Sequence, residues 1–277
     1  HGTPAFPIAC YHDDLRTEPV PWHWHEELEV LVVSEGSVLA AAGGEKYRLE
    51  TGEGLFINAG VLHGDWPLNA GACRLHSMVF HPRLVGGSPD SVFWQKYLSP
   101  LIAAPECRCV PLLGETEWER EILAQIKYIA EIWTQKGYEF EVRTALSKVV
   151  FLLLENCVHH IKAPSERELR DAERIKQMLD YIRTHRPEPI TTEEIAASAN
   201  ISVSECLRCF RRMMNLTPKE YLRQHRIRHA VQLLTQTDWN ITRIGIECGF
   251  EDMSYFARVF RARQGCTPSA YRAKLRK

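Results

Sequence analysis

The chain has 277 residues, of which 45% are apolar and 25% charged; this is a globular composition, and it excludes disordered, collagen-like and disulfide-scaffold proteins. A chain of this length is expected to form two domains. The longest apolar run, Val149 to Leu154, has six residues, which is far below the length of a membrane span. The first nine residues lack signal-peptide features, and the nine cysteines are irregularly spaced. A cytoplasmic protein with reduced cysteines is therefore expected.

The net charge of −1 conceals an asymmetry between the two parts of the chain. Residues 171–277 carry 19 Lys and Arg against 12 Asp and Glu, a net charge of +7, whereas residues 1–170 carry 15 against 23, a net charge of −8. A basic segment favours polyanions and an acidic segment does not. The two parts are therefore expected to have different partners.

The first part of the chain reads as an all-β unit. Short runs rich in β-branched residues alternate with glycines at a spacing typical of a sandwich or a small barrel. Residues 81–114 contain many prolines and glycines, and are expected to wrap the barrel rather than extend it. The predicted strands are Leu28–Val33, Ser37–Ala42, Lys46–Leu49, Gly54–Asn58 and Arg74–Phe80.

Two helices are predicted after Gly114. Apolar residues recur every three to four positions in residues 115–135, and residues 138–160 form a second apolar helix. We expect this pair to pack on the barrel and on a second copy of the chain, so residues 115–162 are predicted to be a dimerisation segment; packing within one chain is the alternative. Residues 163–170 then read as a linker, with Ser165 as a helix N-cap. The predicted dimer contacts are Ile122, Ile126, Ile129 and Trp133.

The last hundred residues contain an internal repeat. The segment from Ser204 to Arg211, followed by Thr217-Pro218, recurs about fifty residues later as the segment from Ser254 to Arg261, followed by Thr267-Pro268. Each copy has a short helix, a turn and a helix with arginines on one face. Ser202 and Asp252 stand where N-caps are wanted, and Asn200 and Gly249 tolerate a left-handed turn position. This pattern predicts two helix-turn-helix units.

The second helix of each unit is suited to the major groove of DNA. Its apolar residues must face inward, so its serines and arginines face out, where guanidinium groups can pair with guanine edges or hold phosphates. A solvated basic face on a helical bundle is the alternative, but two matched copies make it a poor explanation. The predicted DNA contacts are Ser204, Arg208, Arg211, Ser254, Arg258 and Arg261.

Residues 171–277 resemble the DNA-binding domain of AraC/XylS-type transcription regulators. The resemblance rests on Ile244, Gly249-Phe250, Ser254-Tyr255-Phe256, Arg258, Phe260-Arg261, Gly265, Thr267-Pro268 and Tyr271-Arg272. Gly245 stands where alanine is usual, and Cys206 where an aliphatic or aromatic residue is usual. The resemblance implies that the two arginine helices enter successive major grooves on one face of the duplex.

The N-terminal part carries a second motif, in which His23-Trp24-His25 is followed by Glu29, Gly36, Gly52, Gly60 and His63. This spacing resembles the double motif of cupins, with Asn58 in place of the usual proline. Residues two apart on a strand share a face, so His23, His25 and Glu29 are predicted to point to one interior point together with His63. This set suits a divalent transition ion such as Ni, Zn, Mn or Fe. The alternative is that these histidines only make hydrogen bonds or contact an effector directly.

Aromatic residues near these histidines predict an effector pocket, since sugars stack on indole and place their hydroxyls on polar groups. Core packing is the alternative for the tryptophans. The family resemblance also implies an N-terminal arm over the pocket. The predicted pocket residues are Trp22, Trp24, Trp66 and Tyr11.

The sequence thus predicts an α+β two-domain protein with a cupin-like β-barrel in residues 1–114 and a double helix-turn-helix domain in residues 171–277. Its expected function is that of an AraC-like, sequence-specific transcription regulator, an activator or a repressor and not an enzyme, which senses a sugar or a related metabolite. The expected partners are double-stranded DNA, the effector, a second copy of the chain and RNA polymerase, with no membrane. A metal-dependent cupin enzyme and a metal-ion sensor are the rival functions.

Overall fold

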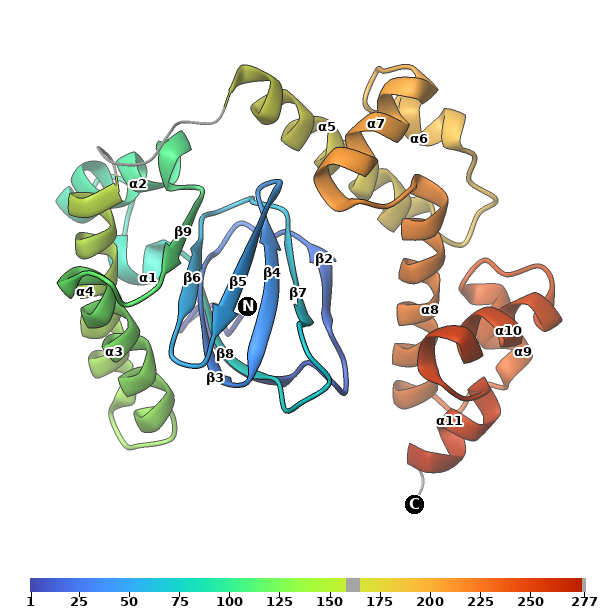
Figure 1. Ribbon diagram of the computed structural model, residues 1–277, viewed down its shortest axis with the longest axis horizontal. Coiled ribbons are helices and arrows are strands. Elements are labelled where there is room, and N and C mark those ends of the chain that lie inside the picture. Colours follow the sequence, from blue (N-terminus) through green and yellow to red (C-terminus); the bar gives the residue numbers. More distant parts are fainter. Residues whose placement is uncertain (158–164, 276–277) are drawn as a thin grey trace. The chain divides into compact units, whose positions relative to one another are not determined.

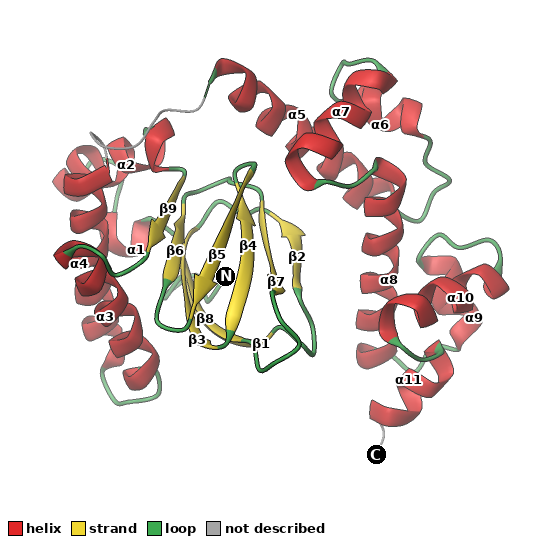
Figure 2. Cartoon of the chain, in the orientation of Figure 1, coloured by secondary structure: helices red, strands yellow, loops and turns green. Residues whose placement is uncertain are grey.

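The computed structural model describes residues 1–157 and 165–275, and the chain divides into two compact units, His1–Ala172 and Glu173–Lys277 (Figure 1). Within the described residues, all strands belong to the first unit and the second unit is helical (Figure 2). The predicted α+β two-domain class is therefore confirmed. All nine cysteines are free thiols, as expected for reduced residues.

Two antiparallel sheets form the β-rich part of the first unit. The larger sheet has the strand order β1-β8-β3-β6-β9 and the smaller has the order β2-β7-β4-β5. The five predicted strands are present, and the sequence reading missed β1, β2, β7 and β9. The strands are β1 (Ile8–Asp14), β2 (Val20–His23), β3 (Leu28–Glu35), β4 (Ser37–Ala42), β5 (Glu45–Glu50), β6 (Gly54–Ile57), β7 (His63–Pro67), β8 (Arg74–Phe80) and β9 (Cys109–Leu112).

Both faces of the larger sheet are buried. Alternate residues of a strand point in opposite directions, so the apolar side chains of this sheet contribute to two cores. On β3, Leu31 and Val33 join the core between the two sheets, together with Val38 and Leu49 of the smaller sheet. Val30 of the same strand points the other way and joins a second core, which includes apolar residues of the helices between residues 117 and 157. Figure 1 shows these helices beside β6 and β9. The parity of β3 therefore tells which of its side chains face the barrel interior.

The segment expected only to wrap the barrel also extends it, so that prediction was wrong. β9 pairs with β6 in the larger sheet. Pro111 is tolerated because β9 is an edge strand, whose free side needs no backbone donor. Asn58 ties this segment to the barrel, because its side-chain nitrogen donates to the carbonyl oxygens of Leu101 at 2.8 Å and Cys107 at 3.1 Å. The short helical turns here are α1 (Arg83–Gly86), η1 (Trp94–Leu98, a π-helix), α2 (Ser99–Ala103) and η2 (Pro105–Cys107, a 3-10 helix).

The two predicted helices that follow are α3 (Glu117–Ile132) and α4 (Tyr138–Cys157). Ile122, Ile126 and Ile129 are fully buried in the core shared with the larger sheet, and Trp133 packs against that core. The three isoleucines therefore cannot form the dimer surface that was predicted for them, because packing within the chain covers them; Trp133 is half-buried. The apolar side chains that α4 leaves exposed are Phe140 (80%) and Phe151 (44%).

The end of the second predicted helix, at residues 158–160, lies outside the described residues, as do residues 163–164 of the predicted linker. Ser165 is the predicted N-cap, since its hydroxyl accepts from the backbone nitrogen of Glu168 at 3.3 Å. Helix α5 (Glu166–His185) begins directly after it, so residues 166–170 are helical rather than linker.

The second unit contains both predicted helix-turn-helix pairs, α6 with α7 and α9 with α10, joined by the long helix α8 (Figure 1). Ser202 and Asp252 are confirmed as N-caps, because each side chain accepts a backbone N–H of the helix that follows. Asn200 and Gly249 have φ of 53° and 80°, which confirms the left-handed turn positions. The helices are α6 (Thr192–Ser198), α7 (Val203–Met214), α8 (Pro218–Gln236), α9 (Ile241–Glu247), α10 (Met253–Gln264) and α11 (Pro268–Leu275).

Among residues 1–157 and 165–275, the structure shows no helix that is both long enough and apolar enough to span a membrane.

Candidate metal centre and nucleic-acid interface

Four side chains, from β2, the loop after it, β3 and β7, meet at the interior of the barrel. Their ligand atoms, one from each of His23, His25, Glu29 and His63, all lie within 4.8 Å of one another. His23 ends β2 and is the register partner of His63 on β7. Glu29 shares a face of β3 with Leu31, toward the interior. The structure therefore brings the four predicted residues together.

The strand argument that predicted this cluster holds only in part. His25 does not share a strand with His23 or Glu29, because β2 ends at His23 and β3 begins at Leu28. The loop between the two strands places His25 against the carboxylate, with its Nε2 3.1 Å from Oε2 of Glu29.

Backbone carbonyls fix the orientation of all three imidazoles. Nδ1 of His23 lies 2.9 Å from the Pro21 oxygen, and Nδ1 of His25 lies 3.1 Å from that of Glu27. Nδ1 of His63 lies 2.8 Å from the Val61 oxygen. A carbonyl only accepts, so each Nδ1 carries a proton, and Nε2 is the ring nitrogen that each histidine can offer to a metal ion. A backbone carbonyl on the far nitrogen is the usual second partner of a metal-binding histidine.

The charges at this cluster favour a cation. Burial would raise the pKa of the Glu29 carboxyl, but its contacts with His25 and His63 hold that pKa well below the ordinary value, so the carboxyl is an anion. Burial, followed by the neighbouring His63, lowers the pKa of His23 to about 3, so this ring is neutral. One anion beside three imidazoles is a donor set that a divalent ion prefers.

One nitrogen of the cluster has no hydrogen-bond partner. Nε2 of His63 is buried and lies 3.0 Å from Oε2 of Glu29, but the contact lacks the alignment of a hydrogen bond. A buried ring nitrogen without a hydrogen-bond partner, beside a carboxylate, is suited to binding a metal ion. The residues present therefore fit Ni, Zn, Mn or Fe.

The aromatic residues predicted for the pocket separate into two groups. Tyr11 of β1 faces the interior, as the register partner of Ser77, and its pKa is raised by burial and by the charge of Glu29. Trp22 and Trp66 pack on each other with ring centroids 5.2 Å apart. Strand parity puts Trp66 on the face of β7 opposite to His63, so this pair does not flank the cluster as expected. Trp24 is half-buried in the loop after β2.

The sequence reading missed Asp65, which lies two residues after His63 on β7. The two side chains share the interior face of the strand, and Asp65 is only 2% exposed. Burial, followed by the charges of Glu29 and Asp13, raises the pKa of its carboxyl well above the ordinary value. Alternation from His63 would have identified this residue if β7 had been predicted.

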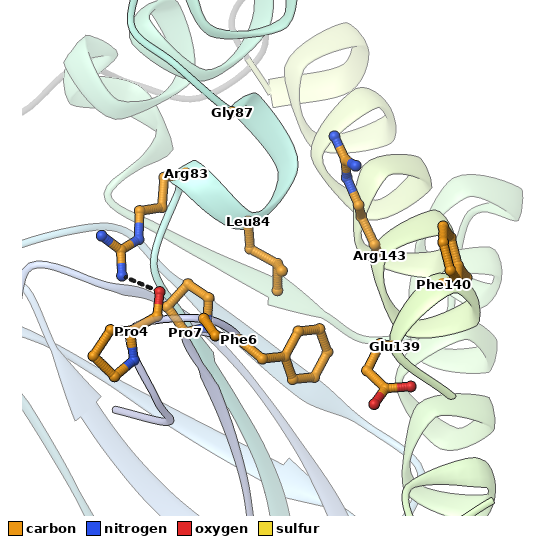
Figure 3. A pocket seen from close by; sticks show the side chains of 10 residues that line it. Pro4, Phe6, Pro7, Arg83, Leu84, Gly87, Glu139, Phe140 and Arg143 are labelled. Carbon is orange, nitrogen blue, oxygen red and sulfur yellow. Dashed lines mark hydrogen bonds between the residues drawn. The ribbon is translucent and has the colours of Figure 1, made fainter. Parts of the chain in front are cut away.

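Two cavities lie elsewhere in the first unit, along α4. One of about 440 Å³ is bounded by the N-terminal segment, α1 and α4, where Arg83 donates to the carbonyl oxygen of Pro4 at 3.0 Å (Figure 3). Another of about 470 Å³ lies between η1 and α4. Phe140 and Arg143 border both cavities, and neither cavity includes a residue of the histidine cluster.

Helices α7 and α10 present the predicted DNA contacts to solvent. The opposite faces of the two helices are buried through residues such as Phe210 and Phe260. An Nη atom of Arg208 bonds the Glu205 carboxylate one turn earlier, while the guanidinium of Arg258 lies 5.4 Å from the ring centroid of Tyr255. The exposed residues are Ser204, Arg208, Arg211, Ser254, Arg258 and Arg261.

Two family descriptions match this chain. Residues 6–131 match the AraC-like ligand binding domain, and residues 195–274 match a helix-turn-helix domain. The chain is 30% identical over 277 residues to the uncharacterized HTH-type transcriptional regulator YdeC of Bacillus subtilis (strain 168). The alignment covers 98% of this chain and 94% of the relative. It is 25% identical to the HTH-type transcriptional activator RhaS of Klebsiella pneumoniae (strain 342), over 89% of this chain and 85% of the relative.

A solved structure shares the fold over both units. The apo form of a point variant of ToxT from Vibrio cholerae strain SCE256 matches with a TM-score of 0.53 and 13% identity, over 97% of this chain and 98% of ToxT. The relatives are regulators, so the prediction of a regulator rather than a cupin enzyme is confirmed. The chain belongs to the AraC family of DNA-binding transcription regulators, with a cupin-like ligand-binding domain followed by a double helix-turn-helix domain.

Proposed function

We propose that this regulator senses a sugar or a related metabolite in its barrel and holds that effector beside a divalent transition ion. The observation that carries the proposal is the cluster of His23, His25, Glu29 and His63, whose ligand atoms lie within 4.8 Å of one another. The ion would supply positive charge and open coordination positions for ligand oxygens. Effector binding then favours one arrangement of the protein over another and so changes DNA binding.

Metal binding is tested on the full chain by calorimetric titration with Zn²⁺ and Ni²⁺, together with elemental analysis. Replacing Glu29→Gln removes the anion of the cluster, so the affinity for the ion should fall at least about 10-fold. His76→Gln alters a histidine of β8 outside the cluster and is the control. Equal affinity in wild type and Glu29→Gln would show that the ion does not bind at Glu29.

A metal-ion sensor is the second candidate, because the same cluster could make the ion itself the signal. Operator binding titrated with and without a chelator separates the two. If the ion is the signal, chelation alone changes operator affinity. If a metabolite is the signal, operator affinity changes only when the metabolite is added to the metal-loaded protein.

Sequence-specific binding is proposed to rest on the exposed arginines of α7 and α10. Arg208→Ala or Arg258→Ala should each weaken operator binding by about 1 to 3 kcal/mol and relax base preference. Lys127→Ala removes an exposed positive charge from α3 in the first unit and is the control. An equal loss on random DNA would show that these arginines only hold phosphates.

We further propose that the regulator acts in the cytoplasm as a homodimer that activates transcription together with RNA polymerase. Activation is supported by the names of relatives such as RhaS, which is called an activator. Dimerisation is supported by the uncovered aromatic side chains of α4, Phe140 and Phe151, because large exposed apolar groups mark interaction surfaces.

A further inference from the structure

The side chain of Asp65 is a buried carboxyl group, and one of its oxygens lacks a hydrogen-bond partner among the described residues. It faces the barrel interior, because its register partner on β4 is Ala40, which belongs to the core between the sheets. Its other register partner is Val20 on β2, so neither neighbouring side chain can donate a hydrogen bond. Within the described part of the chain, Oδ1 of Asp65 has no hydrogen-bond partner.

Such a group is costly to the folded protein. Burying a polar atom without a partner destabilises the folded protein, and native proteins pair nearly all such atoms. A bound ligand that donates to Oδ1 would remove this cost. Asp65 follows His63 by two residues on the same face of β7, so the two Cα atoms are roughly 7 Å apart. A small ligand could therefore donate a hydrogen bond to Asp65 with one group and reach the histidine cluster with another group a few bonds away.

The surrounding charges narrow the class of ligand. A carboxylate ligand would be repelled by Glu29 and Asp13, whose charges act at Asp65. An ammonium group would be repelled by a divalent ion held in the histidine cluster. A neutral hydroxyl avoids both penalties and can donate to Oδ1.

We propose that Asp65 determines the specificity of the effector site by accepting a hydrogen bond from a hydroxyl group of a neutral, polyhydroxylated effector. This inference rests on the proposed function, because the metal-binding cluster supplies the argument against an amine. It replaces the predicted stacking on Trp22 and Trp66, which pack on each other, with recognition by a carboxyl group of β7.

The experiment uses the full chain loaded with Zn²⁺ and a panel of neutral pentoses, hexoses and alditols, with the matching amino sugars, followed by calorimetry. We expect wild type to bind at least one neutral member. Asp65→Leu should weaken that binding by about 10- to 100-fold, and the isosteric Asp65→Asn by less, since an amide oxygen still accepts. Asp90→Asn, in an exposed loop, is the control and should bind as wild type does. Circular dichroism checks that each variant folds.

Titration with Zn²⁺ alone separates this proposal from the metal site. Both Asp65 variants should keep their Zn²⁺ affinity within about 3-fold of wild type. If Asp65→Leu loses Zn²⁺ as Glu29→Gln does, Asp65 is a metal ligand and the proposal is wrong. Unchanged polyol binding in Asp65→Leu, tighter binding of amino sugars, or no polyol binding by wild type would each overturn it, while the Zn²⁺ titration still reports on the cluster.

Discussion

His225 on α8 is an imidazole surrounded by cations. Burial, followed by the charges of Arg228, Arg186, His229 and Arg183, lowers its pKa to about 3. Its Nδ1 is buried and has no hydrogen-bond partner among the described residues. The folded protein therefore keeps this ring neutral at pH values where an unfolded chain would protonate it.

This shift predicts acid sensitivity. The unfolded imidazole titrates near pH 6.5, so between pH 6.5 and about 3 the unfolded chain binds a proton that the folded chain excludes. The stability that neutral His225 provides is complete above pH 6.5 and is lost as the pH falls. In urea unfolding of the full chain between pH 4.5 and 7.5, wild type should lose up to about 1.4 kcal/mol per pH unit relative to His225→Gln.

His185→Gln on α5 is the control, because it also removes one imidazole but leaves His225 in place. The His185 ring stacks on Tyr181, with centroids 4.2 Å apart. If the unfolding free energies of wild type and His225→Gln fall in parallel on acidification, His225 does not cause the sensitivity.

Single residues of the metal centre were predictable where spacing alone identifies them. His23, His25, Glu29 and His63 follow from a motif that needs no knowledge of the strands around it. The positions of Trp66 and Asp65 depend on the parity of β7, which the sequence reading missed. That strand is five residues long, and it contains a glycine and ends in a proline, so it lacks the β-branched pattern that identifies a strand.

At the scale of elements, the turn of the second helix-turn-helix pair depends on Gly249. Its φ is +80°, and a Cβ there would lie 2.5 Å from the carbonyl oxygen of Arg186 and 2.8 Å from an Nη atom of Arg226. Gly265, at the end of α10, has φ of +71° and nothing within 4 Å of the same position. The two glycines share a backbone conformation and differ in the space around them.

Gly265→Ala should therefore cost about 1 to 2 kcal/mol, the penalty of a left-handed conformation for an L-residue. Gly249→Ala should cost clearly more, because the backbone oxygen of Arg186 cannot move aside as a flexible side chain can. Urea unfolding of the two variants measures the difference. Equal losses would show that the turn relaxes to accommodate a methyl group.

Helices were easier to predict than their surroundings. The periodicity of α3 shows that one face is apolar but not what covers it. That face is covered by the larger sheet and α4 rather than by a second copy. In the sequence, an apolar isoleucine face looks the same whether it packs within the chain or on a second copy. The edge strand β9 was missed because Pro111 suggests a loop, although an edge position tolerates it.

On the scale of the whole molecule, α4 carries the prediction about assembly. Phe140 is 80% exposed, so replacing Phe140→Glu should place a charge in the proposed dimer interface and weaken dimerisation about 30-fold or more. Sedimentation equilibrium measures the change. Leu113→Glu alters an apolar residue that is 40% exposed before α3 and should leave the association unchanged. A monomeric wild type, or a dimer indifferent to Phe140→Glu, would rule out this interface.

The two arginine helices differ on their exposed sides. Leu207 is 41% exposed on α7, where the matching position of α10 is Ala257, and Tyr255 is 38% exposed where α7 has Glu205. In the proposed complex, different side chains therefore meet the two halves of the operator, so a site bound by a single chain need not be palindromic. A bound chain acquires a direction along the duplex, and inverting the operator before a promoter would turn the protein around relative to the start of transcription.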